Sequence, residues 1–135
     1  MRSVYPLVNA GTVGPGVGAN ALSFNVDFIV PNFAVGAIFF LNASAMSGTT
    51  PVMDLKFQRL DPISGVAKDV IGASIVQLVA AAAIVMTIDP RNVTVSNNVV
   101  IAQALSRNMR AVFTLDNTSG SSENYTFSLA AEFYS

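Results

Sequence analysis

The residue types that most often perform chemistry in enzymes are largely missing from this chain of 135 residues. It has no histidine and no cysteine, so it lacks the commonest general base, the usual transition-metal ligands and the thiol nucleophile. Carboxylates remain, and they are spread singly along the chain: Asp27, Asp54, Asp61, Asp69, Asp89, Asp116, Glu123 and Glu132. A glycosidase needs two carboxyl groups facing each other across a cleft, and sequence spacing neither places nor excludes such a pair. We therefore expect a protein that is not an enzyme and has no catalytic residues and no cofactor.

Two further patterns are candidate ligand sites. Asp61, Asp116 and Glu123 fall in predicted loops, but nothing resembles the acid-dense loop of a dedicated calcium motif, so we interpret them as solvated turn residues and predict no metal site. The glycine-rich segment 11–18 is followed by no Lys-Ser or Lys-Thr pair, and Pro15 removes a backbone donor, so a phosphate-binding loop is disfavoured. An extended arm is the better interpretation of that segment.

The composition indicates a protein that is covered by other surfaces. Hydrophobic residues make up 52% of the chain and charged residues only 11%, whereas an ordinary soluble domain carries about 25% charged residues. The formal net charge is −1 and the seven cations are scattered, so the clustered positive charge that nucleic-acid binding requires is missing. A neutral surface rich in Ala, Val and Phe suits burial against copies of the same chain or against a large partner.

One uncharged segment, 70–88, approaches the length of a membrane span. Gly72, Ser74, Gln77 and Thr87 interrupt it, so we predict two buried strands at 74–79 and 84–88, with a short Ala-rich helix as the alternative. No membrane partner is expected. The first residues run into Gly and Pro without the apolar segment of a signal peptide, so secretion is not expected either.

The remaining chain alternates between apolar and polar residues with the two-residue period of strands. In 52–60, Met53, Leu55 and Phe57 fall on one face and the charged side chains fall on the other. In 125–133, the apolar face consists of Tyr125, Phe127, Leu129, Ala131 and Phe133. The predicted strands are 22–30, 36–45, 52–60, 66–71, 74–79, 84–88, 109–115 and 125–133, with 109–115 and 125–133 separated by a polar hairpin loop at 116–124. The stretch 89–106 is less regular.

This pattern predicts an all-β fold, an antiparallel β-sandwich of jelly-roll or immunoglobulin-like type with an extended glycine-rich N-terminal arm. We expect the arm to occupy residues 1–20 and the β-sandwich domain to occupy residues 21–135.

The order of turns and strands resembles a known family. The turn Ser47-Gly48-Thr49-Thr50-Pro51 precedes the strand 52–60, the Asp and Gly loop 61–65 follows it, and Ile88-Asp89-Pro90 and Tyr125-Thr126-Phe127-Ser128-Leu129 come later. Over about four-fifths of the chain this order resembles the small β-sandwich decoration (cement) proteins of tailed-bacteriophage heads. Two features depart from the family pattern: Val66-Ala67-Lys68 stands where a Trp is often found, and the glycine-rich arm is additional.

The resemblance implies a virion structural protein that stabilises a bacteriophage capsid by binding the outer surface of the major capsid protein lattice. It implies a homotrimer on the capsid outer surface, assembled in the host cytoplasm. The alternative is a host-surface carbohydrate recognition module of a phage head or tail fibre. Within the arm, apolar side chains are expected to contact an adjacent subunit or the shell: Val4, Tyr5, Leu7, Val8, Val13 and Val17. Deletion of residues 1–20 is then expected to weaken attachment and to leave the sandwich folded.

Overall fold

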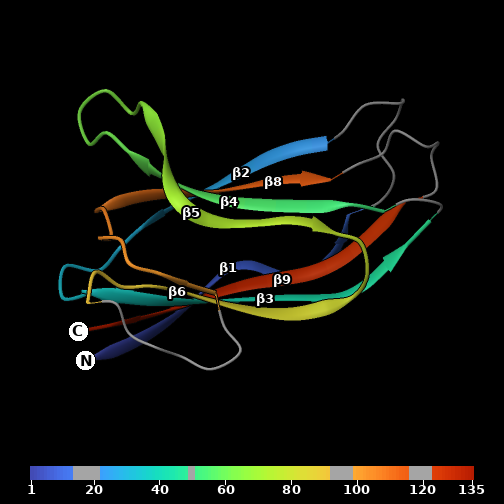
Figure 1. The fold of residues 1–135 in the computed structure, drawn as a ribbon, viewed down its shortest axis with the longest axis horizontal. Coiled ribbons are helices and arrows are strands. Elements are labelled where there is room, and N and C mark those ends of the chain that lie inside the picture. The colour runs from blue at the N-terminus through green and yellow to red at the C-terminus, as the bar shows by residue number, and fades with distance from the viewer. Residues whose placement is uncertain (14–21, 49–50, 92–98, 116–122) are drawn as a thin grey trace.

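A computed structural model of the protein describes residues 1–13, 22–48, 51–91, 99–115 and 123–135. Two β-sheets face each other across one apolar core (Figure 1). The five-stranded sheet has the order β1 (Arg2–Val13), β9 (Asn124–Tyr134), β3 (Gly36–Ser47), β6 (Ala82–Ile88) and β7 (Val99–Ile101). The four-stranded sheet has the order β2 (Leu22–Ile29), β8 (Asn108–Leu115), β4 (Met53–Leu60) and β5 (Ala67–Leu78).

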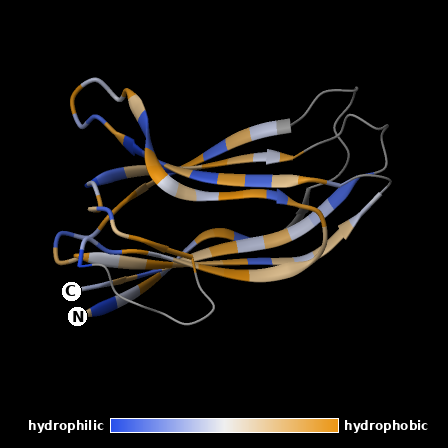
Figure 2. Cartoon of the chain, viewed as in Figure 1, coloured by the Kyte–Doolittle hydropathy of each residue, from blue (hydrophilic) through white to orange (hydrophobic). Residues whose placement is uncertain are grey.

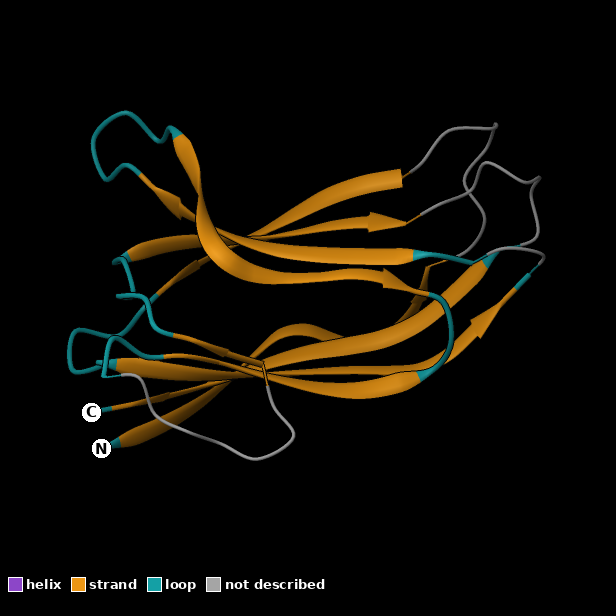
Figure 3. Ribbon diagram, viewed as in Figure 1, coloured by secondary structure: helices purple, strands orange, loops and turns teal. Residues whose placement is uncertain are grey.

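The connections identify the type of sandwich. Neighbouring strands are antiparallel except β6 and β7, which are parallel. Successive strands repeatedly pass from one sheet to the other, so that β1-β9-β3-β6 faces β2-β8-β4-β5, the arrangement of a jelly roll. The described residues contain strands and loops and no helix (Figure 3), and hence no helix that could span a membrane. The predicted all-β antiparallel sandwich is confirmed.

The core follows the predicted alternation of side chains. Every second residue of β9 is buried, beginning at Tyr125, and β4 buries Met53, Leu55 and Phe57 while its polar residues stay partly exposed. Figure 2 shows the resulting alternation of hydropathy along β4. Aromatic rings from both sheets meet in the interior; the rings of Phe39 and Phe57 lie 4.3 Å apart. Burial of these faces is the main force that holds the two sheets together.

A tyrosine also joins the sheets by hydrogen bonds. The hydroxyl of Tyr125 in β9 accepts a hydrogen bond from the backbone N–H of Val52 at 3.0 Å and donates one to the carbonyl oxygen of Val52 at 3.2 Å. Val52 directly precedes β4 in the opposite sheet. The one polar atom of this buried side chain is therefore used to fix the entry to β4.

Two predictions about strands were wrong. The segments 66–71 and 74–79 form one strand, β5, because register shifts against β4 absorb the irregular residues between them, and Gly72 takes the positive φ of 83° that this requires. The segments 109–115 and 125–133 are not a hairpin. They form β8 and β9 in opposite sheets, and the connecting residues 116–122 lie outside the described part of the chain.

The N-terminal segment also differs from the predicted arm. Residues 2–13 form β1, which pairs along β9 of the same chain from Arg2 opposite Tyr134 to Val13 opposite Tyr125. The division at residue 20 therefore does not separate an arm from the sheets. The strand tolerates Pro6 and two register shifts because it lies at a sheet edge, where only one side needs hydrogen bonds.

Candidate functional site

The outer faces of the two sheets differ in charge. Across the four-stranded sheet, a polar row runs through Asp27, Arg110, Gln58 and Asp69, one residue from each strand. The guanidinium of Arg110 donates to both carboxylate oxygens of Asp27 at 2.6 and 3.1 Å, and Gln58 Nε2 donates to Asp69 Oδ1 at 2.8 Å. These hydrogen bonds lower the pKa values of both aspartates. This face presents ionised groups to water.

The outer face of the five-stranded sheet is almost free of charge, and we call it the neutral face. It is the face opposite to the buried residues of β3 and β9, and its apolar members are Val4, Pro6, Ile38, Phe40, Val85 and Ala130. Among the described residues of these strands, the charged side chains on this face are Arg2 and Glu132. They neutralise each other through an ion pair of 2.7 Å.

Phe40 lies at the centre of the neutral face. The register of the sheet places Pro6, Ala130, Phe40 and Val85 side by side in one row across β1, β9, β3 and β6. Phe40 is 39% exposed, a large fraction for a phenylalanine in a central strand. An apolar row with an exposed aromatic ring and little charge around it is typical of the core of a protein interface.

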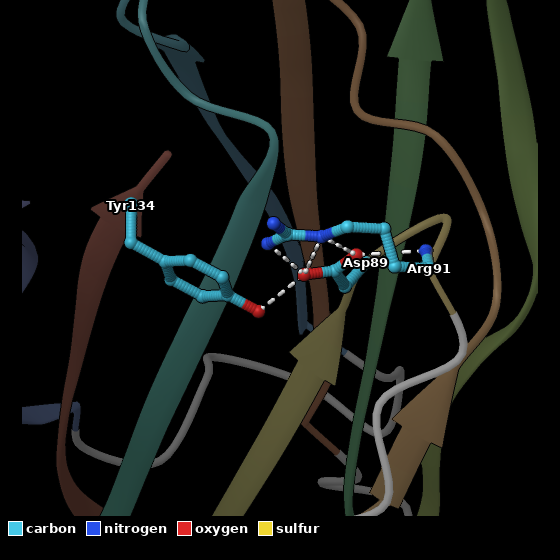
Figure 4. Close-up of polar contacts among 3 residues, drawn as sticks. All are labelled: Asp89, Arg91 and Tyr134. Atoms are coloured by element: carbon cyan, nitrogen blue, oxygen red, sulfur yellow. Dashed lines mark hydrogen bonds and ion pairs between the residues drawn. The ribbon is translucent and has the colours of Figure 1, made fainter.

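A buried carboxylate cluster lies at one end of the same sheet, formed by Asp89, Arg91 and Tyr134 (Figure 4). Asp89 is fully buried and accepts four contacts from Arg91, the shortest from Nη2 at 2.7 Å, and one from the hydroxyl of Tyr134 at 2.7 Å. Gly36 makes room for the cluster, because a Cβ there would lie 2.5 Å from the Tyr134 ring and 2.6 Å from Asp89 Oδ2.

The contacts within this cluster shift the pKa values of Asp89 and Tyr134 in opposite directions. Hydrogen bonds from Arg91, and then the one from Tyr134, hold the pKa of Asp89 well below its usual range. Burial and then the hydrogen bond to Asp89 raise the pKa of Tyr134 to about 12. Both shifts keep Asp89 ionised and Tyr134 neutral near neutral pH, and the hydrogen bond between them joins the ends of β6 and β9.

A shallow groove lies on the outer face of the four-stranded sheet. Its volume is about 270 Å³ and its lining comes from β4, β5 and β8: Asp54, Leu55, Lys56, Ser74, Ile75, Val76, Val112 and Thr114. Asp54 Oδ1 accepts a hydrogen bond from the N–H of Gln77 at 2.6 Å, and Lys56 lies 3.2 Å from Asp69. None of the described residues that line the groove is aromatic.

The residues predicted for the arm take different positions. Leu7 and Val8 are partly buried and pack against the core of their own sandwich. Contact of these two side chains with a neighbouring subunit stays a prediction. Val4 is 67% exposed on the neutral face, and Tyr5 is 44% exposed with its ring 5.7 Å from that of Phe133. Val13 has its backbone in β1 but a side chain outside the described part, and Val17 lies outside the described residues altogether.

The acids considered for a metal site are not brought together. Asp61 lies in the turn between β4 and β5, where its carboxylate accepts hydrogen bonds from Ile63 N and Ser64 N, and Glu123 is buried at the start of β9. Asp116 lies outside the described residues. Among the residues that are described, no group of three potential metal ligands occurs.

Comparison with known proteins identifies the fold. No family model matches the chain, and no curated protein matches its sequence. Among solved structures, that of the infectious bursal disease virus Gx strain matches with a TM-score of 0.56 and 11% identity, over 99% of this chain and 32% of that chain. The infectious bursal disease virus VP2 subviral particle matches with a TM-score of 0.50 and 10% identity, over 99% and 32%. The chain therefore shares a jelly-roll fold with these viral proteins.

A third match is TmCBM61 in complex with beta-1,4-galactotriose, with a TM-score of 0.45 and 8% identity over 99% of this chain and 88% of that chain. The chain spans about a third of the length of the two viral proteins. At these identities the likeness concerns the fold, and function has to be argued from the surface.

Sequence reasoning predicted a neutral surface without locating it, and it missed the Asp89 cluster. The outward apolar residues of β3 were visible in Ile38 and Phe40, which continue an uninterrupted run from Ala37 to Leu41. Such a run indicates a strand that is apolar on both faces. The partnership of Asp89 with Tyr134 carried no sequence signal, because the two residues are 45 positions apart.

Proposed function

We propose that this protein is a structural protein of a bacteriophage particle, which decorates the capsid by binding the outer surface of the major capsid protein lattice through its neutral face. The observation that supports the proposal most is the apolar row centred on Phe40. The charged side chains described on this face, Arg2 and Glu132, form an ion pair with each other. A polar, charged surface on the opposite sheet is suited to facing the solvent.

The physical role of such attachment is stabilisation. A protein that binds the assembled shell but not its separated subunits shifts the equilibrium toward the shell, and it needs contact area rather than catalysis. Burial of Phe40 and its neighbours supplies the hydrophobic contribution. The ion pair between Arg2 and Glu132 is already formed within the chain, so little charge must lose hydration without a partner.

The alternative of carbohydrate recognition has less support among the described residues. Sugar-binding surfaces typically present exposed aromatic rings. The groove on the four-stranded sheet has none, and the exposed ring of Phe40 belongs to the neutral face.

The test uses Phe40→Asp, which places a charge at the centre of the neutral face. We expect binding to empty capsids of the virus that encodes the chain to weaken by about thirtyfold, corresponding to a loss of about 2 kcal/mol from one central aromatic contact. Ile29→Asp is the matched control, because Ile29 is 63% exposed on the four-stranded sheet. Circular dichroism checks that both variants are folded, and cosedimentation with capsids measures binding. Unchanged binding by a folded Phe40→Asp protein would exclude the neutral face as the attachment surface.

A further inference from the structure

The cationic side chains of this protein divide into two sets. Four of them form ion pairs with carboxylates: Arg2 with Glu132, Lys56 with Asp69, Arg91 with Asp89 and Arg110 with Asp27. The other three, Arg59, Lys68 and Arg107, pair with no carboxylate among the described residues. They lie near the end of β4, at the start of β5 and directly before β8, so they share one end of the four-stranded sheet.

Two of these cations are neighbours. Arg59 and Lys68 stand directly opposite each other across β4 and β5, so their side chains leave the sheet on the same face. Like charges in that position destabilise a sheet. The guanidinium of Arg59 is fixed by two hydrogen bonds to the carbonyl oxygen of Ala104, from Nε at 3.1 Å and from Nη2 at 2.7 Å. An anion bound between Arg59 and Lys68 would relieve their repulsion.

Both cations line a pocket, which we call the end pocket and which consists of Arg59, Leu60, Asp61, Pro62, Val66, Lys68 and Ser106. Its volume of about 340 Å³ falls within the roughly 300 to 1,000 Å³ of small-molecule sites. Leu60, Pro62 and Val66 form its apolar wall, and Val66 is 54% exposed. Ser106 also lines an adjoining pocket that contains Arg107, so the third unpaired cation lies beside the end pocket.

The carboxylate of Asp61 limits the charge that a ligand of the end pocket should carry. Its Oδ1 accepts hydrogen bonds from Ser64 N at 3.0 Å and from Ile63 N at 2.8 Å, and these lower the pKa of Asp61. Asp61 is therefore ionised at neutral pH. Arg59 and Lys68 contribute two positive charges and Asp61 one negative charge, so the pocket has a net charge of +1. This balance suits a monoanion better than the dianion of a phosphate monoester.

We propose that the end pocket binds a carboxylate that is attached to an apolar group. The carboxylate lies between Arg59 and Lys68, and the apolar group packs against the apolar wall. Two sources carry this chemistry, a free apolar acid and the C-terminal residue of a polypeptide when that residue is apolar. The inference goes beyond the proposed function, because the site lies at the end of the sandwich rather than on the neutral face and needs no capsid.

The first experiment titrates small carboxylates into the protein at millimolar concentration and follows its backbone amides by two-dimensional NMR. N-acetyl-leucine should shift the amides of Val66, Lys68 and Ser106 in a saturable manner. N-acetyl-leucinamide has the same shape without the charge, and acetate has the charge without the apolar group, so each should bind at least about tenfold more weakly. 4-Methylpentanoate is N-acetyl-leucine without its acetamido group. Binding as tight as that of N-acetyl-leucine indicates a free acid as the ligand, and weaker binding indicates a polypeptide C-terminus.

The second experiment changes the charge of the pocket. Lys68→Gln should weaken binding of N-acetyl-leucine about fivefold, as expected for the loss of an exposed ion pair. Lys56→Gln is the matched control and should bind as the unmodified chain does, because Lys56 pairs with Asp69 and lies outside the end pocket. Asp61→Asn keeps the oxygen that closes the turn and removes the opposing charge, so it should bind about threefold more tightly.

Three results would each overturn the proposal: no shift of the end-pocket amides with N-acetyl-leucine, equal binding of N-acetyl-leucinamide, or unchanged binding by a folded Lys68→Gln variant. Weaker binding by a folded Asp61→Asn variant would contradict the assigned charge balance and overturn it as well. Phe40→Asp should bind N-acetyl-leucine as tightly as the unmodified chain. Failure of this proposal is therefore distinguishable from failure of capsid attachment through the neutral face.

Discussion

At the scale of single residues, Asp89 is the buried charge on which one end of the five-stranded sheet depends. Its carboxylate is fully buried, yet Arg91 and Tyr134 supply hydrogen bonds to both of its oxygens. The cluster joins the chain just after β6 to the last residue of β9, and Gly36 at the start of β3 must lack a side chain for it to form. The carboxylate of Asp89 therefore lies where the ends of β6, β9 and β3 come together.

We expect Asp89→Asn to lower the free energy of unfolding at neutral pH by about 2 kcal/mol, since hydrogen bonds to charged groups contribute more than neutral ones. The pKa of Asp89 is depressed in the folded state, so its contribution is complete above the pKa of the unfolded state, about 3.9, and is lost as the pH falls toward the folded-state value. Urea unfolding from pH 7 to pH 3 should show a constant difference between the two proteins down to about pH 4 and a smaller one below.

Asp69→Asn is the control for that measurement, because the side chain of Asp69 is 58% exposed. Its substitution should change stability by less than about 1 kcal/mol, as expected for an exposed ion pair. Equal effects of the two substitutions on the free energy of unfolding would mean that the buried cluster stabilises the fold no more than an exposed ion pair does.

At the scale of elements, the N-terminal strand is part of the fold. β1 forms a hydrogen-bonded ladder with β9, and Leu7 and Val8 pack against the core. Deleting residues 1–13 should lower the free energy of unfolding by about 3 kcal/mol or more, since full burial of such a side chain contributes about 1.5 to 3 kcal/mol. The thermal midpoint, followed by circular dichroism, should fall by roughly 10 °C.

The matched control for the deletion is Val4→Thr, because Val4 belongs to β1 but is 67% exposed, and threonine keeps the β-branched shape without adding a charge opposite Glu132. This variant should keep its thermal midpoint. A truncated protein that melts at the original temperature would restore the interpretation of residues 1–20 as an arm without a role in folding.

How far the sequence could predict these elements depends on the kind of information each needed. The inward faces of β4 and β9 followed from the two-residue period alone. The sheet to which a strand belongs did not, because the same alternation fits either sheet, and β8 and β9 were therefore wrongly joined as a hairpin. The continuity of β5 was hidden because register shifts interrupt the alternation near Gly72.

The sequence predicted that a neutral surface exists, but it did not predict where on the fold that surface lies. Composition alone indicated a neutral surface, since charged residues make up 11% of the chain. The location of that surface needed the register of β1, β9, β3 and β6, which brings Pro6 beside Ala130 and Phe40 beside Val85. Contacts between residues so far apart in sequence follow from topology rather than from local preference.

At the scale of the whole molecule, the outer face of the four-stranded sheet is charged and the outer face of the five-stranded sheet is nearly neutral. Attachment through the neutral face should therefore be insensitive to salt. Salt screens interactions between exposed charges, and the one ion pair on the neutral face is internal to the chain. Raising the ionic strength from about 0.05 to 0.5 M should change the affinity for capsids by less than about threefold. Cosedimentation across this range measures it; a steep loss of binding would indicate attachment through the polar face.

The two chain ends meet in this fold. The amino group of Met1 donates to Ser135 Oγ at 3.0 Å, and Ser135 N donates to the carbonyl oxygen of Met1 at 3.2 Å. Figure 1 shows both ends emerging side by side. A linker of a few residues could therefore join them into a circular backbone without disturbing either sheet. New chain ends could then be opened in a surface turn of the circular backbone. A guest domain inserted at such a turn would be joined to the sandwich at both of its ends.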